Sequence, residues 1–134
     1  MDCLFCKIVA GEIPSKQVFE DENVVVFMDI FPINDGHVLV VPKKHYVSIN
    51  DMTDKEYIDY QLSFKKIYDK FTNNFGADGF TIVQNLGLPQ EVKHLHTHIH
   101  PVYENQNGIK FTKLADRDKL DEYAEIIKRF YRRN

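Results

Sequence analysis

Four histidines alternate with other residues in the segment 94–100, which has the sequence His-Leu-His-Thr-His-Ile-His. Successive side chains of a β-strand point to opposite faces, so this spacing predicts a strand with four imidazoles on one face. Imidazole titrates near neutral pH, binds metal ions and can act as a nucleophile, and burying it unpaired costs free energy. Alternate side chains are roughly 6–7 Å apart at their roots, so two rings can meet one phosphate group but four cannot. The segment therefore predicts a strand that carries the chemistry of the protein.

Other patterns along the chain predict the elements around that strand. Short apolar runs bounded by turn residues indicate strands at 17–20, 24–29, 37–41 and 80–85. A long helix is expected to begin at Thr53, which forms a capping-box pattern with Glu56, and to end near Gly76. Shorter helices are expected at 4–10 and 118–131. We therefore expect an α+β fold with a mainly antiparallel five-stranded sheet, one long helix and a C-terminal helix.

Two of the expected helices carry an apolar stripe that predicts which face is buried. In both, apolar residues recur at steps of three and four, which places them on one side of the helix. We expect both stripes to face the core. The stripe of the long helix consists of Tyr57, Tyr60, Phe64, Ile67 and Phe71. The stripe of the C-terminal helix consists of Leu120, Tyr123, Ile127 and Phe130.

The size and charge of the chain limit the class of protein. Its 134 residues suit one domain spanning 1–134, without an internal repeat or a long linker. The net charge of −3 gives no indication of nucleic-acid binding, and the basic segment 128–133 is interpreted as the solvated end of a helix. No apolar run is long enough to cross a bilayer, and no signal pattern opens the chain. With two cysteines only, we expect a reduced, cytoplasmic protein with no membrane partner.

Cys3 and Cys6 form a Cys-x-x-Cys pair near the N-terminus. Such a pair needs two further ligands to close a tetrahedral zinc site, and the candidates are His45 and one histidine of the segment 94–100. The alternatives are two small buried thiols or a redox-active dithiol. The redox interpretation requires a strand before the pair, for which the chain leaves no room. A metal ion here would hold a terminus that otherwise frays.

The histidine segment itself has two functional interpretations. One is a polyhistidine site for a transition-metal ion. The other is phosphate chemistry, in which one neutral imidazole attacks phosphorus and its neighbours donate protons to oxygens. The pattern of the segment alone leaves both open.

The order of motifs along the chain resembles the histidine triad (HIT) superfamily of nucleotide hydrolases and transferases. Residues 90–99 resemble its signature, His-φ-His-φ-His-φ-φ, in which φ is apolar. The segments 5–14, 26–30 and 36–45 resemble the preceding blocks of that family in the same order. The similarity covers nearly the whole chain and is closest to the small nucleoside phosphoramidases. It implies the HIT-like fold, a homodimer, and a purine nucleotide of the AMP or GMP type as substrate or product.

The resemblance also implies roles for individual residues. His96 would attack the α-phosphate to form a nucleotidyl-histidine, His98 would contact the phosphate and assist the leaving group, and His37 would lie beside the same phosphate. Asp29 would bind the ribose hydroxyls. The other implied nucleotide-binding residues are Phe5, Ile8, Ile13, Phe27, Ile30, Asn85, Gln90 and Val92. The implied ligands of a structural Zn²⁺ are Cys3, Cys6, His45 and His94.

Some positions depart from the family pattern. His100 stands where an apolar residue is usual, as either an added surface polar group or an added phosphate or metal contact. Val102 stands where many relatives have arginine, and Thr97 replaces a large apolar residue with a mild loss of packing. Leu88-Pro89 stands where a phosphoramidase usually has glycines. The leaving group is therefore left open by the sequence.

The most direct interpretation is a nucleotide hydrolase or nucleotidyl transferase of the phosphoramidase kind. Within the enzymes, the alternative is a dinucleoside polyphosphate hydrolase. A different class is a nucleotide-binding scaffold with little turnover, although pure binding does not need His96. A third alternative is a transition-metal carrier that uses His96, His98 and His100.

Overall fold

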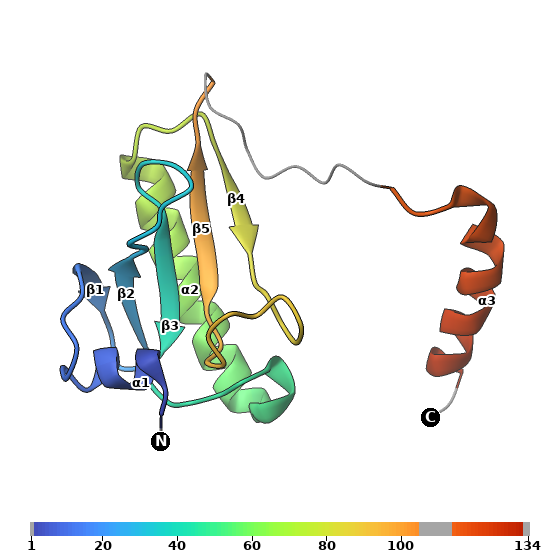
Figure 1. The fold of residues 1–134 in the computed structure, drawn as a ribbon, viewed down its shortest axis with the longest axis horizontal. Coiled ribbons are helices and arrows are strands. Elements are labelled where there is room, and N and C mark those ends of the chain that lie inside the picture. The colour runs from blue at the N-terminus through green and yellow to red at the C-terminus, as the bar shows by residue number, and fades with distance from the viewer. Residues whose placement is uncertain (1, 105–113, 133–134) are drawn as a thin grey trace.

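A computed structural model describes residues 2–104 and 114–132 of the chain. Its centre is a five-stranded sheet with the order β1-β2-β3-β5-β4, in which each neighbouring pair is antiparallel (Figure 1). The strands are β1 (Gln17–Glu20), β2 (Val24–Met28), β3 (Val38–Pro42), β4 (Gly79–Val83) and β5 (Thr97–Val102). The helices are α1 (Leu4–Val9), α2 (Asp54–Asn74) and α3 (Leu120–Tyr131), with the 3-10 helices η1 (Ile49–Asp51) and η2 (Arg117–Lys119). The predicted α+β fold is confirmed.

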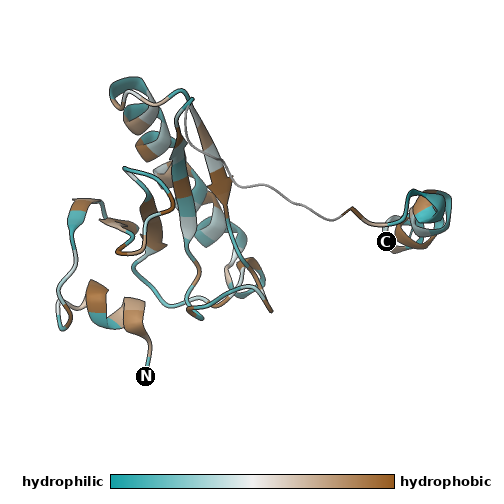
Figure 2. Cartoon of the chain, turned by 45° about the horizontal axis from the view of Figure 1, so that its top comes forward, coloured by the Kyte–Doolittle hydropathy of each residue, from teal (hydrophilic) through white to brown (hydrophobic). Residues whose placement is uncertain are grey.

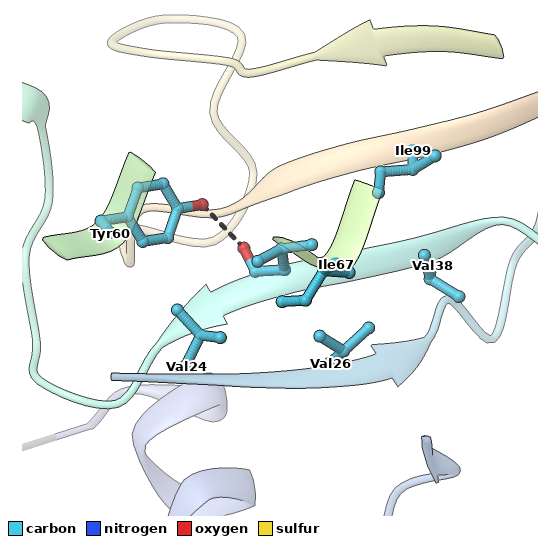
Figure 3. Close-up of a cluster of buried hydrophobic side chains, with 7 residues drawn as sticks. Val24, Val26, Val38, Tyr60, Ile67 and Ile99 are labelled. Atoms are coloured by element: carbon cyan, nitrogen blue, oxygen red, sulfur yellow. Dashed lines mark hydrogen bonds between the residues drawn. The ribbon is translucent and has the colours of Figure 1, made fainter. Parts of the chain in front are cut away.

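Both faces of the sheet are covered, so β2 and β3 are almost entirely buried. Alternate residues of these strands point to opposite faces and form two apolar clusters. The cluster on the α2 face, drawn in Figure 3, contains Val24, Val26, Val38, Val40, Tyr60, Ile67 and Ile99. The cluster on the α1 face contains Cys3, Phe5, Val25, Phe27, Leu39 and Val41. The second cluster holds the N-terminal segment, and with it both cysteines, against the sheet.

The register of β5 decides which face the histidines take. His98 lies opposite Leu39 of β3, and Thr97 lies opposite Val40. Residues directly opposite each other in a sheet share a face, so His98 and its i+2 neighbour His100 point to the α1 face. Thr97 points to the α2 face. The predicted separation of histidines from the residues between them is confirmed for this strand.

The strand boundaries differ from the sequence prediction at the functional end. β5 begins at Thr97, so His94 and His96 lie in the segment that leads into the strand. Their carbonyl and amide groups are therefore outside the ladder and can contact side chains. The prediction of one strand over 94–100 is wrong for its first half. β4 ends at Val83, which leaves Asn85 in the following loop.

Helix α2 begins and packs as its sequence pattern predicts. The Thr53 side chain accepts from the Glu56 amide at 3.1 Å, and the Glu56 carboxylate accepts from the Thr53 amide at 2.9 Å. The predicted capping box is confirmed. Tyr60 and Ile67 lie in the α2-face cluster, and Phe64 and Phe71 pack against it. The remaining residue of the predicted stripe, Tyr57, is partly exposed.

Helix α3 stands apart from the sheet, as Figures 1 and 2 show, and none of its residues is buried. The four apolar residues of its stripe are between 48% and 66% exposed. The prediction that they face the core of this chain is wrong. Helical periodicity indicates that a face needs a partner, but it does not say which surface the partner belongs to. Within the described residues, no helix has the length and apolarity needed to cross a membrane.

Candidate active site and metal site

Four side chains from three separate segments converge beside helix α1. Cys3 caps the N-terminus of the helix and Cys6 lies one turn later, while His45 follows β3 and His94 precedes β5. Their ligand atoms all lie within 4.8 Å of one another. The Nδ1 atom of His94 is 3.4 Å from Cys3 Sγ, 3.5 Å from Cys6 Sγ and 3.3 Å from His45 Nδ1. Cys6 Sγ is 3.3 Å from His45 Nδ1.

These four distances match edges of a tetrahedron of zinc ligands. Bond lengths of about 2.3 Å for Zn–S and about 2.0–2.1 Å for Zn–N place two nitrogen ligands about 3.3 Å apart and nitrogen about 3.6 Å from sulfur. The second nitrogen of His94, Nε2, donates to the Pro42 carbonyl at 2.8 Å. That bond assigns the ring proton to Nε2 and leaves Nδ1 as a lone pair facing the cysteines. The four residues could hold a metal ion, as the sequence predicts.

His96 lies two residues further on, at the edge of the α1-face cluster. Its Nδ1 is 2.7 Å from the carbonyl oxygen of His94, and because a carbonyl only accepts, Nδ1 carries the proton. Nε2 is then a free lone pair. The His96 ring packs edge-on against Phe5, with the ring centroids 4.9 Å apart. Burial lowers the pKa of His96 from its ordinary value, against the raising effect of its bond to the His94 carbonyl.

His37 and His98 form a directed pair next to His96. The Ile33 amide donates to Nδ1 of His37 at 3.2 Å, so the proton of His37 is on Nε2. Nε2 of His37 lies 2.9 Å from Nδ1 of His98 and donates to it. The proton of His98 is therefore on Nε2, where it can reach a ligand.

Asp29 supplies the negative charge nearest to this pair. One carboxylate oxygen accepts from the Phe31 amide at 2.8 Å, which closes a turn after β2. The other oxygen lies 3.4 Å from Nε2 of His37 and 4.0 Å from Nδ1 of His98. Burial lowers the pKa of His37, and Asp29 opposes that shift. Burial and the three neighbouring histidines lower the pKa of His98 to about 4, so it is neutral at pH 7.

His100 is buried beside the same pair, with 2% of its surface exposed. The centroid of its ring lies 3.9 Å from that of the His37 ring. The ring is nearly parallel to that of His98, with the two centroids 5.3 Å apart. The interpretation of His100 as a surface polar group is therefore wrong. The three histidines that converge are His37, His98 and His100, so His37 replaces His96 in the set predicted for a metal carrier.

The remaining predicted nucleotide-binding residues occupy different environments. Phe5 and Phe27 meet edge-to-face with centroids 5.4 Å apart, and Ile8 and Val92 pack against the same cluster. Ile13 and Asn85 are partly exposed, whereas Ile30 is 75% exposed and does not pack as a wall.

Gln90 is the most buried polar residue of the predicted set. Its amide nitrogen donates to the Val47 carbonyl at 2.8 Å. Its Oε1 atom is one of two buried side-chain atoms in the described part of the chain without a hydrogen-bond partner. The orphaned acceptor suits a ligand N–H or O–H group.

The sequence alone gave no indication of two features of the site, the backbone groups that set the histidine tautomers and the hydrogen bonds of Thr97. The Ile33 amide and the His94 carbonyl set the ring tautomers, and backbone groups of that kind become visible only once the loops are folded. Thr97 was assigned a loss of packing, but its hydroxyl bonds to Tyr60 at 2.6 Å and accepts from Gln84 at 2.9 Å. The hydroxyl of Thr97 is therefore paired, while the expected mild loss of packing stays a prediction.

A neutral histidine with a free ring nitrogen, next to four residues that could hold a metal ion, is an arrangement suited to nucleophilic histidine chemistry. The model of the HIT domain family matches residues 10–105. An uncharacterized HIT-like protein of Methanocaldococcus jannaschii is 46% identical over 129 residues, which is 94% of this chain and 98% of that protein. The chain belongs to the HIT family.

Three further similarities bear on the site. The adenosine 5'-monophosphoramidase hnt1 of Schizosaccharomyces pombe is 35% identical over 111 residues, covering 81% of this chain and 80% of that protein. The crystal structure of a HIT family member from Bacillus subtilis has a TM-score of 0.87 at 34% identity and covers 100% of this chain and 98% of its own. A zinc-bound histidine triad protein from Mycobacterium smegmatis has a TM-score of 0.71 at 31% identity, with 96% and 97% covered.

Proposed function

We propose that this protein is a nucleoside phosphoramidase, which hydrolyses the bond between the α-phosphorus of a purine nucleotide and an amine. The observation that carries the proposal is the 2.7 Å contact between His96 Nδ1 and the His94 carbonyl. It fixes the tautomer in which Nε2 of His96 is a lone pair. A neutral imidazole of this kind can attack phosphorus without first losing a proton.

The proposed reaction has two displacements. In the first, Nε2 of His96 forms a bond to phosphorus, and the bond from phosphorus to the leaving amine breaks. In the second, water attacks phosphorus and the bond to His96 breaks, so that the nucleotide gains a hydroxyl and the amine a proton overall. His98 offers its Nε2–H to a phosphate oxygen or to the leaving group, and His37 keeps the His98 ring in that tautomer.

The other predicted residues are assigned to substrate binding. Phe5 and Phe27 offer an apolar wall for the base next to His96. Asp29 is assigned to the ribose hydroxyls through the oxygen that does not hold the Phe31 amide. Gln90 Oε1, buried and without a donor, supports a leaving group that carries N–H. The activity named for the Schizosaccharomyces pombe relative supports an amine as well.

The metal in the first site is proposed to be zinc, held by Cys3, Cys6, His45 and His94. The ligand distances and the zinc-bound relative from Mycobacterium smegmatis support this choice. Four protein ligands leave no open position, so the ion would hold the segment around His94 rather than activate water. Zinc binding requires the cysteines as thiolates, which supports a reducing, cytoplasmic location.

We further propose a homodimer in which the apolar face of α3 packs against a second copy of the chain. Leu120, Tyr123 and Ile127 lie on that face and are exposed in the single chain. The acidic first turn and basic last turn of α3 complement the helix dipole, which favours the helix that presents this apolar face. Replacing Tyr123 and Ile127 by aspartate is expected to give a monomer by light scattering, whereas the same changes at exposed polar Glu122 and Glu125 leave the dimer intact.

The decisive experiment is intact-protein mass spectrometry after rapid quenching, without acid, of the protein mixed with an adenosine phosphoramidate. We expect a nucleotidyl adduct that peptide mapping locates on His96. The variant His96→Ala is expected to form none and to lose turnover at least 10³-fold while it keeps its metal and fold. Normal turnover by this variant would contradict the mechanism.

Relative rates distinguish the alternatives. A higher rate on the phosphoramidate than on a diadenosine polyphosphate supports the proposal, and the reverse identifies a dinucleoside polyphosphate hydrolase. Nucleotide binding with negligible turnover of both substrates would identify a scaffold protein.

A further inference from the structure

A second group of potential metal ligands lies on the α1 face of the sheet, separate from the cysteine site. His37 precedes β3, and His98 and His100 belong to the adjacent strand β5. Each residue offers a ring nitrogen, and the three nitrogen atoms lie within 4.8 Å of one another. His37 and His100 are each 2% exposed. The side chains are therefore held in place by packing.

His100 is the residue that the triad chemistry does not explain. Its Nδ1 is buried and has no hydrogen-bond partner within the described part of the chain. An unsatisfied buried polar atom destabilises the folded state, and an apolar residue at this position would avoid that cost. The other such atom among the described residues, Oε1 of Gln90, is assigned above to a donor of the proposed substrate. His100 likewise lacks a partner among residues 2–104 and 114–132.

We propose that His37, His98 and His100 form a second, exchangeable site for a borderline transition-metal cation such as Zn²⁺, Co²⁺, Ni²⁺ or Cu²⁺. Imidazole suits these ions, and three imidazoles leave a fourth position for water or a phosphate oxygen. Oδ2 of Asp29 lies 3.4 Å from Nε2 of His37 and 4.0 Å from Nδ1 of His98. Its negative charge there favours a bound cation.

The hydrogen bonds of His37 make this site weaker than the cysteine site. Nδ1 of His37 accepts from the Ile33 amide, and Nε2 donates to His98. Binding a cation through Nε2 moves the His37 proton to Nδ1. The Nδ1–H then faces the N–H of Ile33, and two donors cannot form a hydrogen bond with each other. The loss of that hydrogen bond lowers the affinity relative to a site with two thiolates, so the ion at the histidines exchanges more readily.

Occupancy of this site is expected to slow turnover, and this part of the inference rests on the proposed function. Nε2 of His37 and Nδ1 of His98 are 2.9 Å apart when they share a proton. Two nitrogen ligands of one zinc ion are about 3.3 Å apart. A bound cation therefore replaces the contact that orients His98. Its open position also holds a phosphate oxygen of the product.

The test begins with protein whose cysteine site is filled with one equivalent of Zn²⁺. Co²⁺ is then titrated in and followed by calorimetry and by visible absorption, which reports coordination without any need for turnover. We expect the wild type to bind one further ion and His100→Leu to bind none, or to bind it at least tenfold more weakly. The control Ile99→Val changes a buried neighbour of His100 without removing a ligand and is expected to bind as the wild type does.

A matched measurement follows inhibition of phosphoramidate hydrolysis by added Zn²⁺. The inhibition constant is expected to rise at least tenfold in His100→Leu and to stay unchanged in Ile99→Val. If the wild type binds a single ion in total, or if His100→Leu retains the second ion at full affinity, the inference is wrong. If the leucine variant fails to fold, His100→Asn replaces it, and it is likewise expected to lose the second ion. An inactive protein that still loses its second ion in His100→Leu would contradict the proposed function but not this site.

Discussion

The backbone carbonyl of His94 lies 2.7 Å from Nδ1 of His96, while the side chain of His94 lies among the cysteines. One residue thus offers a metal ligand through its ring and orients the proposed nucleophile through its backbone. The two candidate sites therefore share the segment 94–96. Metal binding should therefore influence turnover through the position of that carbonyl.

The first prediction concerns loss of the metal. Cys6→Ser is expected to remove the bound zinc, to lower the melting temperature and to reduce kcat about tenfold or more, with a smaller change in KM. The physical reason is that His94 loses the contact that holds its segment, and the His96 tautomer becomes less well defined. Elemental analysis, thermal unfolding and steady-state kinetics measure the three effects. Full activity in a zinc-free, folded variant would show that the two sites are independent.

A second prediction concerns the proton that His37 gives to His98. His37→Leu removes the donor 2.9 Å from His98 Nδ1, so the His98 ring can adopt the other tautomer. We expect kcat to fall about 10²-fold, the lower end of the range for general acid–base groups, with KM changed less.

The conservative variant His37→Gln separates orientation from packing, because its amide N–H can donate to His98 in place of the imidazole. It is expected to recover part of the lost kcat. Equal losses in the leucine and glutamine variants would mean that His37 acts through its bulk alone.

A third prediction concerns the buried hydroxyl of Tyr60. It donates to the Val40 carbonyl at 2.9 Å, the dashed line in Figure 3, and lies 2.6 Å from the Thr97 hydroxyl. Tyr60→Phe is expected to lower the free energy of unfolding by about 1–3 kcal/mol, because the Val40 carbonyl and the Thr97 hydroxyl each lose one hydrogen bond. Tyr57→Phe, on the more exposed part of the same helix, is the control and should change stability little. Urea unfolding measures both.

The double variant Tyr60→Phe with Thr97→Val tests whether the two hydroxyls act as a pair. Removing both hydroxyls at once leaves fewer unpaired polar groups than the two single variants leave in total. The double variant should therefore be less destabilised than the sum of the single variants. Strict additivity would show that the Tyr60–Thr97 contact contributes nothing of its own.

Sequence patterns predicted features whose cause is local or periodic. The capping box of Thr53 and Glu56 depends on residues three apart, so it was visible before folding. The common face of His98 and His100 follows from the period of a strand. The cysteine pair was recognisable because zinc ligands have characteristic spacings.

Features that depend on distant segments were not predictable in this way. The hydroxyl of Thr97 bonds to Tyr60 and Gln84, which are 37 and 13 positions away, so the comparison of Thr97 with the family pattern gave no sign of these bonds. His100 is buried against the ring of His37, which comes from a segment 63 positions earlier in the chain. The apolar stripe of α3 correctly indicated a helix, but the surface that covers it is not set by the helix itself.

The last prediction concerns the pH dependence of stability at Glu56. Its carboxylate accepts hydrogen bonds from Lys44 at 2.8 Å, from the Thr53 amide at 2.9 Å and from the Tyr46 hydroxyl at 2.6 Å. These bonds, with that from Lys44 the most important, lower the pKa of Glu56 from 4.5 to about 2. A carboxylate with a depressed pKa in the folded state stabilises the protein above its unfolded pKa. That contribution is lost as the pH falls from about 4.5 towards about 2.

Glu56→Gln isolates the effect of the charge, because glutamine can still accept from the Thr53 amide in the capping box. We expect the variant to be less stable than the wild type at pH 7 and the difference to shrink steadily between pH 5 and pH 3. Urea unfolding across this range measures it, and zinc release at low pH is common to both proteins and cancels in the difference. The exposed residue Glu12 provides the control, since Glu12→Gln should follow the wild type at every pH. A difference between wild type and Glu56→Gln that stays constant from pH 7 to pH 3 would show that the stabilisation does not come from the ionised carboxylate.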